Sequence, residues 1–111
     1  MTRNAKSTKA TKIEYDQNGM IKTKTSCARS VGTTVQLEKL FYSLPVRHKE
    51  FLKNLKKDYH KLLYVVQSYC LISEGIKLSL YHVMQDKSTK LMSTQSKNNL
   101  KDNIIEIFGS K

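Results

Sequence analysis

Lysines recur at a regular interval in the middle of the sequence. Lys49, Lys53, Lys57 and Lys61 are spaced four residues apart, so a helix would place all four on one face. An ammonium group on a flexible stem suits backbone phosphates better than the planar edges of bases. This spacing predicts a surface that binds a polyanion without sequence preference. A solvated face kept for solubility is the alternative.

Six basic side chains make up the predicted DNA-binding face: Arg47, Lys49, Lys53, Lys56, Lys57 and Lys61. If they neutralise four to six phosphates, log K falls against log salt with a slope of about −4 to −5. Only Tyr64 adds an aromatic ring to this face, so base stacking is not the expected main mode.

The charge balance agrees with a polyanionic partner. The chain has 111 residues, with 20 Lys+Arg against nine Asp+Glu, and a formal net charge of +11. Such an excess suggests nucleic acid or an acidic membrane surface. No apolar run approaches the roughly 20 residues that a spanning helix needs. The charge alone leaves nucleic acid and an acidic membrane surface open, and the family resemblance described below implies DNA as the partner and no membrane partner.

Patterns that would indicate catalysis do not occur in the sequence. It has no Gly-rich nucleotide loop, no HExxH and no GxSxG. The three histidines and nine carboxylates show neither metal-ligand spacing nor an acid–base pair. Cys27 and Cys70 are too few for a disulfide framework, and Cys70 is predicted to be a buried thiol in a reducing compartment. No autonomous active site, metal site or bound cofactor is predicted.

Hydrophobic patterning predicts the elements that would position the basic face. Residues 1–11 lack periodicity and are predicted to form a flexible tail. Two β-prone runs, 13–16 and 20–25, flank Asn18-Gly19, which is a strong hairpin signal. Alternation over 33–38 predicts a third strand.

The helical period begins at Lys49 and continues to Ser73. Gly75 is the expected stop signal. The apolar stripe of this helix is predicted to contain Phe51, Leu55, Tyr59, Leu62, Leu63, Val66, Tyr69, Cys70 and Ser73.

A second strand pair and a short helix complete the pattern. Residues 76–83 and 91–94 are predicted strands around a turn at 86–89, and 100–108 is a predicted short amphipathic helix. The predicted fold class is α+β, a mainly antiparallel sheet with one long and one short helix. A globule of 12.8 kDa would expose about 6,300 Å² and bury about two-thirds of its extended surface.

Three blocks of sequence carry a resemblance to a known family. They are Gly-Thr-Thr-Val at 32–35, Leu-Phe at 40–41 and Leu-Pro-Val-Arg-His-Lys-Glu-Phe at 44–51. Together they resemble the MutL mismatch-repair family, and the last block resembles its eukaryotic Pms class. The likeness extends over about residues 12–109.

The resemblance implies a place within a larger protein. Residues 12–39 would be the terminal strands of a GHKL-type ATPase domain. Residues 40–111 would be part of a ribosomal-protein-like β-α-β transducer domain. The chain would then be a fragment of a nuclear mismatch-repair protein that pairs with a second MutL homologue as a heterodimer.

The family's nucleotide-binding Gly-Thr pair falls on Gly32 and Thr33. In the family, the Thr hydroxyl helps to hold the carboxylate that reads adenine. The catalytic Glu, the metal-binding Asn and the Gly-rich lid have no counterpart in this sequence. ATP and Mg²⁺ are therefore implied for the intact parent, and no cofactor or ATP hydrolysis is expected for this chain alone.

Two other interpretations are compatible with the residues. The chain would be a stand-alone basic nucleic-acid-binding module with no ATPase parent, or an interaction fragment that docks through its apolar loop, residues 40–46.

Overall fold

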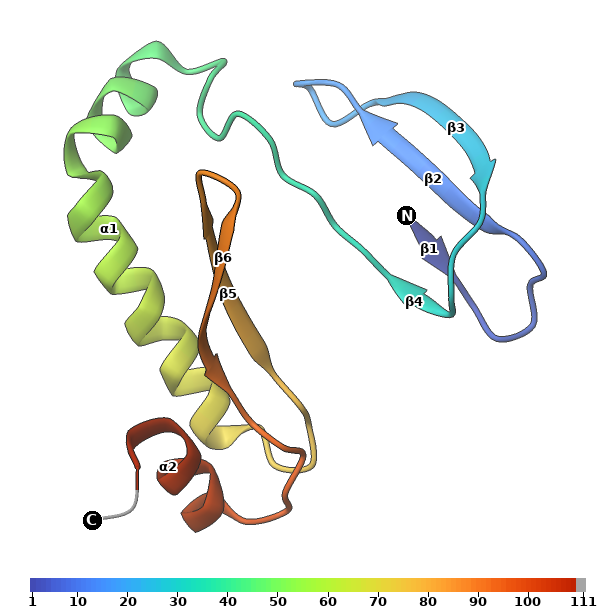
Figure 1. Ribbon diagram of the computed structural model, residues 1–111. Helices are drawn as coiled ribbons and strands as arrows, with labels where there is room; N and C mark the ends of the chain where they lie inside the picture. The colour runs from blue at the N-terminus through green and yellow to red at the C-terminus, as the bar shows by residue number, and fades with distance from the viewer. Residues whose placement is uncertain (110–111) are drawn as a thin grey trace. The chain divides into compact units, whose positions relative to one another are not determined.

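The computed structural model describes residues 1–109. These residues form two compact units, of which the first is Met1–Lys53 and the second begins at Asn54. The fold class is α+β with antiparallel sheets and two helices, as predicted (Figure 1). The predicted division at residue 40, and the predicted domain that runs to residue 111, beyond the described residues, stay predictions.

The first unit is built on a four-stranded antiparallel sheet with strand order β3-β2-β1-β4. Its main hairpin joins β2 (Ala10–Tyr15) to β3 (Ile21–Cys27), as the Asn-Gly signal predicted. The Asp16 carboxylate closes the turn by accepting the backbone N–H groups of Asn18 (2.8 Å) and Met20 (3.0 Å). Gly19, at φ +79°, supplies the left-handed conformation that this turn requires.

The predicted flexible tail is wrong, because residues 1–11 contain strand structure. β1 (Thr2–Arg3) pairs with both β2 and β4, and β2 already begins at Ala10. The backbone of Met1 and Thr34 extends this pairing through the bond from Thr34 N to Met1 O at 2.8 Å. Such long-range partners leave no periodic signal in the sequence, so a short polar strand looks like a tail.

The predicted third strand is much shorter than its alternation suggested. β4 covers Gly32–Thr33 only, because its sole neighbour β1 offers two residues for pairing. Val35 and Leu37 lie beyond that pairing and are 78% and 82% exposed. The alternating pattern therefore marks apolar side chains that nothing in the first unit covers.

Helix α1 runs over Pro45–Ile72, longer at its start than the predicted 49–73. Proline suits the first helical position. A backbone N–H at that position has no helical partner, so its absence in proline costs nothing, and the fixed φ of proline is already helical. His48 N–H donates to the Leu44 carbonyl at 2.8 Å, which forms the first turn. The predicted start of the helix was later than Pro45 because Phe51 is the first apolar residue of the predicted stripe.

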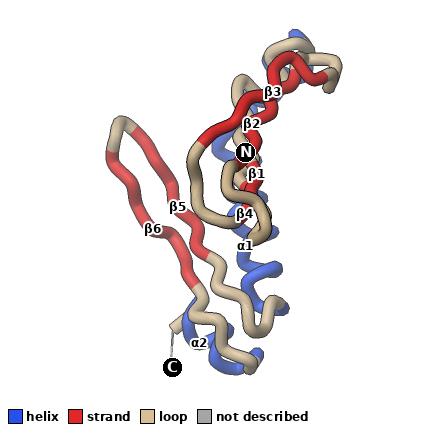
Figure 2. The backbone as a smooth tube through the Cα atoms, turned by 90° about the vertical axis from the view of Figure 1, so that its right-hand side faces the viewer, coloured by secondary structure: helices blue, strands red, loops and turns tan. Residues whose placement is uncertain are grey.

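In the second unit, the part of α1 from Asn54 onward lies beside a hairpin of β5 (Ser79–Met84) and β6 (Lys87–Ser93) (Figure 1, Figure 2). Two side-chain contacts join helix and hairpin. The hydroxyl of Tyr59 lies 2.7 Å from His82 Nδ1, and the Cys70 thiol lies 4.0 Å from the Met92 sulfur. Cys70 is buried, as predicted, and burial raises its pKa.

The predicted turn of this hairpin was placed too late in the sequence. Gln85 and Asp86 form a two-residue turn, and both have positive φ, at 49° and 63°. Residues 87–90, partly assigned to the turn from composition, belong to β6. Polar side chains on an exposed strand hide the period of two, which explains the error.

Polar side chains lock α2 (Leu100–Phe108) to the rest of the second unit. Asn99 caps the helix through its bond from Lys101 N (2.9 Å). The Asn103 amide is fully buried and donates to the Leu71 carbonyl at 3.2 Å, with a longer contact of 3.5 Å to the Ser73 carbonyl. It therefore satisfies carbonyl groups that the C-terminus of α1 leaves without helical partners.

Thr94 performs a similar task at the end of β6. Its buried hydroxyl donates to the Ile76 carbonyl and accepts the Leu78 N–H, both at 3.0 Å. Its own N–H donates to the Leu78 carbonyl at 2.8 Å. The segment between α1 and β5 is thus fixed by hydrogen bonds rather than by apolar packing.

The chain exposes more surface than expected for its mass. Its accessible area is 9,733 Å², against about 6,300 Å² for a compact globule of this mass. About half of the extended surface is buried, where two-thirds was predicted. Within the predicted stripe of α1, Cys70 is buried, but Leu55, Leu62 and Tyr69 are exposed.

Replacing Asn103 by Ala should lower the free energy of unfolding by about 1–3 kcal/mol, because buried carbonyls lose their donor. Asn103→Asp should cost more, since it adds a carboxylate facing those carbonyls. Urea denaturation followed by circular dichroism measures both. Lys101→Ala, on the exposed side of the same helix, is the control and should change little. Equal stability of all variants would contradict the capping role.

Candidate nucleic-acid interface

The six basic residues predicted to bind DNA all lie on α1. Each of their side chains is exposed, from the first turn of the helix onward. The residues are Arg47, Lys49, Lys53, Lys56, Lys57 and Lys61. Helical geometry spaces residues four apart by about 6 Å along the axis, so the lysines every four residues form one row.

Few acidic groups neutralise this row. Lys61 Nζ lies 3.8 Å from Asp58 Oδ1, a solvent-exposed pair that is worth little in water. Among the residues that the structure describes, none of the other five basic side chains forms an ion pair. His60 Nδ1 donates to the Lys56 carbonyl at 2.7 Å, which directs its ring toward the helix backbone. The row can therefore attract phosphates with nearly its full charge.

The predicted nucleotide-binding pair lies in β4, in the first unit. Gly32 has φ +137°, a conformation that an L-residue rarely adopts, and an added Cβ would lie 3.3 Å from the Arg29 guanidinium. The Thr33 hydroxyl lies 2.9 Å from the hydroxyl of Thr2. Glycine is thus required here by backbone geometry alone.

Two arginines that the sequence did not single out hold this region together. Arg29 Nη1 donates to the Met1 carbonyl (2.9 Å) and to Thr34 Oγ1 (2.8 Å), while Arg3 Nη1 donates to the Arg29 carbonyl (2.8 Å). Guanidinium groups have several donors in a fixed plane and suit such bridging. No sequence period marks them, because their partners are backbone oxygens far along the chain.

The residues around Gly32 and Thr33 do not by themselves fit ATP and Mg²⁺. Within the described part of the chain, no carboxylate hydrogen-bonds Thr33, and the neighbouring arginines donate to protein oxygens. Over residues 1–109, no group of three His, Cys, Asp or Glu side chains is placed to hold a metal ion. The chain therefore contributes the Thr33 hydroxyl and the backbone at Gly32, which do not make a complete nucleotide site.

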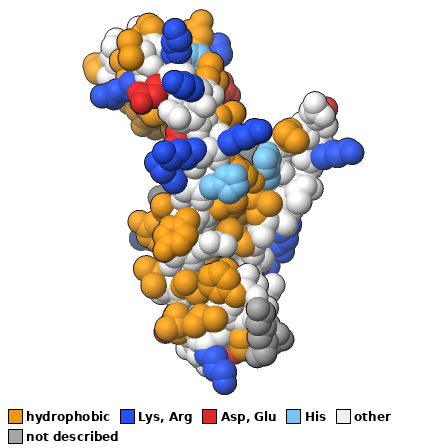
Figure 3. Space-filling model, turned by 90° about the vertical axis from the view of Figure 1, so that its left-hand side faces the viewer, with side chains coloured by type: hydrophobic (Ala, Val, Ile, Leu, Met, Phe, Trp, Pro, Cys, Tyr) orange, Lys and Arg blue, Asp and Glu red, His pale blue; other side chains and the backbone are white. Residues whose placement is uncertain are grey.

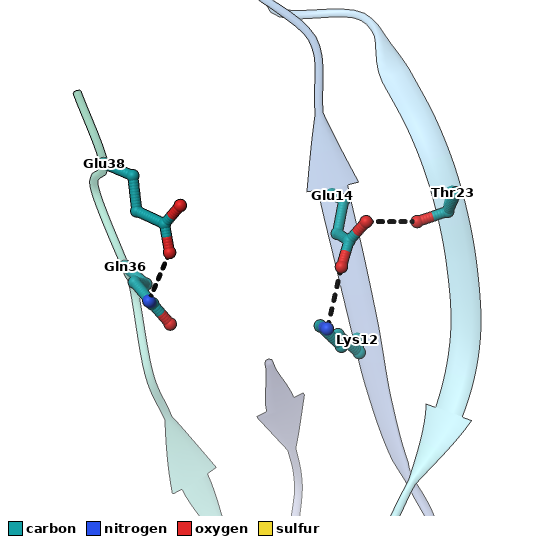
Figure 4. A network of polar contacts seen from close by, with 5 residues as sticks. All are labelled: Lys12, Glu14, Thr23, Gln36 and Glu38. Atoms are coloured by element: carbon teal, nitrogen blue, oxygen red, sulfur yellow. Dashed lines mark hydrogen bonds and ion pairs between the residues drawn. The ribbon is translucent and has the colours of Figure 1, made fainter. Parts of the chain in front are cut away.

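Further polar contacts lie on and beside the strands of the first unit (Figure 4). Lys12 Nζ lies 2.7 Å from the Glu14 carboxylate, which also accepts the Thr23 hydroxyl at 3.1 Å. The hydrogen bond from Lys12 is the main reason why the pKa of Glu14 is lowered, and the bond from Thr23 adds to it. Nearby, Gln36 donates to Glu38 at 2.6 Å. The bonds of Lys12, Glu14 and Thr23 join residues of β2 and β3, and the bond of Gln36 joins two residues beyond β4, so these contacts are structural in character.

No helix among the described residues is both long enough and apolar enough to span a bilayer.

Comparison with known proteins identifies the family. No protein-family model matches the chain. The chain is 44% identical over 102 residues to mismatch repair endonuclease PMS2 of Gallus gallus, covering 91% of this chain and 12% of that protein. It is 36% identical over 100 residues to postmeiotic segregation increased 2-like protein 5 of Homo sapiens, covering 90% of this chain and 74% of that protein. The chain belongs to the Pms-type MutL family of mismatch-repair proteins.

A solved structure supports the same assignment for the fold. It is the crystal structure of the N-terminal domain of a DNA repair protein, which superposes with a TM-score of 0.86 at 41% identity. The match covers 92% of this Pms-type chain and 30% of that one. The chain spans about an eighth of the length of the PMS2 and PMS1 proteins that it matches.

The Lys12–Glu14 pair gives a direct test of the electrostatics. Lys12→Ala should raise the pKa of Glu14 toward its ordinary value, because the largest stabilisation of the carboxylate is removed. Thr23→Val should act in the same direction but less strongly. Side-chain NMR titration between pH 2 and 7 measures the shift. Lys9→Ala is the matched control, and an unchanged Glu14 titration in Lys12→Ala would refute the pairing.

Proposed function

We propose that this Pms-type chain acts in DNA mismatch repair and that α1 faces the phosphate backbone of DNA. The observation that carries the proposal is the exposed row of basic side chains on one continuous helix. Lysine dominates the row, so contacts would be to phosphates and would not discriminate sequence. The net charge of +11 would also speed association with a polyanion.

Family membership supports a second part of the proposal. The chain would contribute the segment that connects a GHKL-type ATPase domain to DNA, within a ribosomal-protein-like transducer domain. Gly32 and Thr33 would support the nucleotide site only when the longer protein supplies the adenine-reading carboxylate and the Mg²⁺ ligands. ATP and Mg²⁺ would therefore belong to the intact parent.

Partner and location follow from the same membership. The PMS2 and PMS1 proteins that the chain matches are mismatch-repair proteins of eukaryotes, which supports a nuclear location. A second MutL homologue as heterodimer partner stays a prediction.

Charge reversal on α1 tests the DNA-facing role. Lys53, Lys57 and Lys61 are changed together to Glu, and binding to a fluorescent duplex is followed by anisotropy at salt concentrations of about 50 to 200 mM. Affinity should fall about tenfold or more, and the slope of log K against log salt should become shallower by about 3, since three phosphate contacts are lost.

A matched control separates local contacts from net charge. Lys87, Lys90 and Lys101 are exposed and lie outside α1. Changing these three to Glu reverses the same number of charges, so both variants have a formal net charge of +5 instead of +11. The control should retain most of the salt slope. Equal losses in both variants would show that binding responds to net charge and not to the α1 row.

The incomplete nucleotide site gives a further expectation. Calorimetric titration of the chain with a non-hydrolysable ATP analogue and Mg²⁺ should give no saturable binding in the micromolar range, because the clamping groups are not present together. Micromolar binding with one site per chain would overturn the incomplete-site interpretation and leave the DNA-binding proposal intact.

A further inference from the structure

The turn between β2 and β3 contains a pair of residues that can react with each other. Of the chain's asparagines, Asn18 alone is followed by a glycine. Asn18 and Gly19 are both exposed, and apart from chain neighbours no atom lies within 4 Å of the position that a Cβ on Gly19 would occupy. The backbone nitrogen of Gly19 is therefore accessible to the side-chain amide of the residue before it.

The side-chain amide of Asn18 is not held by other groups. None of the hydrogen bonds between described residues involves this amide. In contrast, the Asn103 amide is buried and donates to backbone carbonyls, and the amides of Asn4 and Asn99 each accept a backbone N–H. Among the described residues, Asn18 alone combines an unbound side-chain amide with a following glycine.

These two groups can react with water as the only other reactant. The Gly19 nitrogen loses its proton to water or hydroxide and attacks Cγ of Asn18, which closes a cyclic imide. The new N–Cγ bond replaces the bond between Cγ and Nδ2, and the departing nitrogen takes up a proton and leaves as ammonia. Water then opens the imide at either carbonyl, giving aspartate or, where the backbone C–N bond breaks, isoaspartate. Ring closure is favoured because the chain holds the reacting groups close together.

Asp16 opposes this reaction because it fixes the turn. Its carbonyl oxygen accepts the Gly19 N–H at 3.1 Å, and its carboxylate accepts the N–H groups of Asn18 at 2.8 Å and Met20 at 3.0 Å. The Gly19 nitrogen must leave its carbonyl partner before it can lose its proton and attack. These bonds lie at an exposed turn, where local opening requires little free energy. The reaction rate therefore depends on how often the turn opens.

We propose that Asn18 deamidates in the folded chain by attack of the Gly19 nitrogen, and that Asp16 sets the rate by holding the turn closed. Asn18 is thus a covalent modification site. The proposal rests on the geometry of the turn and does not depend on DNA binding or on the role in repair.

The products weaken the hairpin from which they form. Isoaspartate lengthens the backbone between residue 18 and Gly19, so the N–H groups of the turn no longer align with Asp16. Both products also add a carboxylate close to that of Asp16, and like charges repel. Deamidation therefore loosens the turn that joins β2 to β3.

The added carboxylate also makes the product separable from the unmodified chain. The formal net charge falls by one from +11. Lys and Arg side chains are exposed on the face that Figure 3 shows, with few acidic side chains among them. A cation exchanger should therefore release the deamidated chain at a lower salt concentration than the unmodified chain.

Ageing the whole folded chain at neutral pH tests the site. Proteolysis and mass spectrometry locate the exchange of an amide for a carboxyl group, and the chain unfolded in urea gives the reference rate. Folded Asn18 should convert at a rate within about a hundredfold of the unfolded rate, because the exposed turn opens locally. Asn103 should remain unmodified, and Asn18→Gln should stop the reaction at residue 18. A larger reduction in the folded chain would show that only global unfolding exposes the pair, and would overturn the proposal.

Two variants of Asp16 test its role. Asp16→Ala removes the charge and the side-chain acceptor, whereas Asp16→Asn removes the charge but retains an acceptor for the N–H groups. Asn18 should convert faster in Asp16→Ala than in Asp16→Asn by about threefold or more, since weaker anchoring lets the turn open more often. Circular dichroism confirms that both variants fold. A smaller difference, or the reverse order, would overturn the role of Asp16 in holding the turn.

Discussion

The governing constraint on the second unit is the mismatch between a long helix and a narrow sheet. Helix α1 has 28 residues, of which those from Asn54 onward belong to the second unit, whereas the sheet of that unit has two strands. A helix buries apolar surface only where a partner lies against it, and two strands span about 5 Å in the pairing direction. The hairpin therefore covers one side, through residues such as Tyr59 and Cys70, and the adjacent apolar side stays in solvent.

Hydrogen bonds compensate in part for this thin core. Asn103 and Thr94 are the two fully buried polar side chains of the described residues, and both bind backbone groups at the ends of elements. In the first unit, Arg29 and Asp16 act similarly on loops and turns. These bonds specify where elements end, whereas apolar packing sets little of the geometry. The Oδ1 atom of Asn103 remains without a partner, a cost of using one amide to satisfy two carbonyls.

Local signals in the sequence predicted the elements with strong periods or strong turn residues. The Asn18-Gly19 hairpin, the body of α1 and the helix α2, which Gly109 caps, are of this kind. Elements that depend on distant partners were missed or misplaced, as with β1 and the short β4. The five lysines were placed on one helix as predicted, since their spacing indicates a helix, whereas Arg47 was predicted in the loop before it and lies in its first turn. The roles of Arg29 and Asn103 were beyond prediction, because their partners are backbone atoms brought close only by the fold.

The large exposed surface has a thermodynamic consequence. The heat capacity change of unfolding and the denaturant dependence of stability both scale with the area newly exposed on unfolding. A chain that buries about half of its extended surface, 9,733 Å² remaining accessible, has less area left to expose than a compact protein of equal length. Its stability should therefore vary gently with temperature and urea, with broad transitions and weak cooperativity. Any contact that covers the exposed side of α1 would make stability depend more steeply on both temperature and urea concentration.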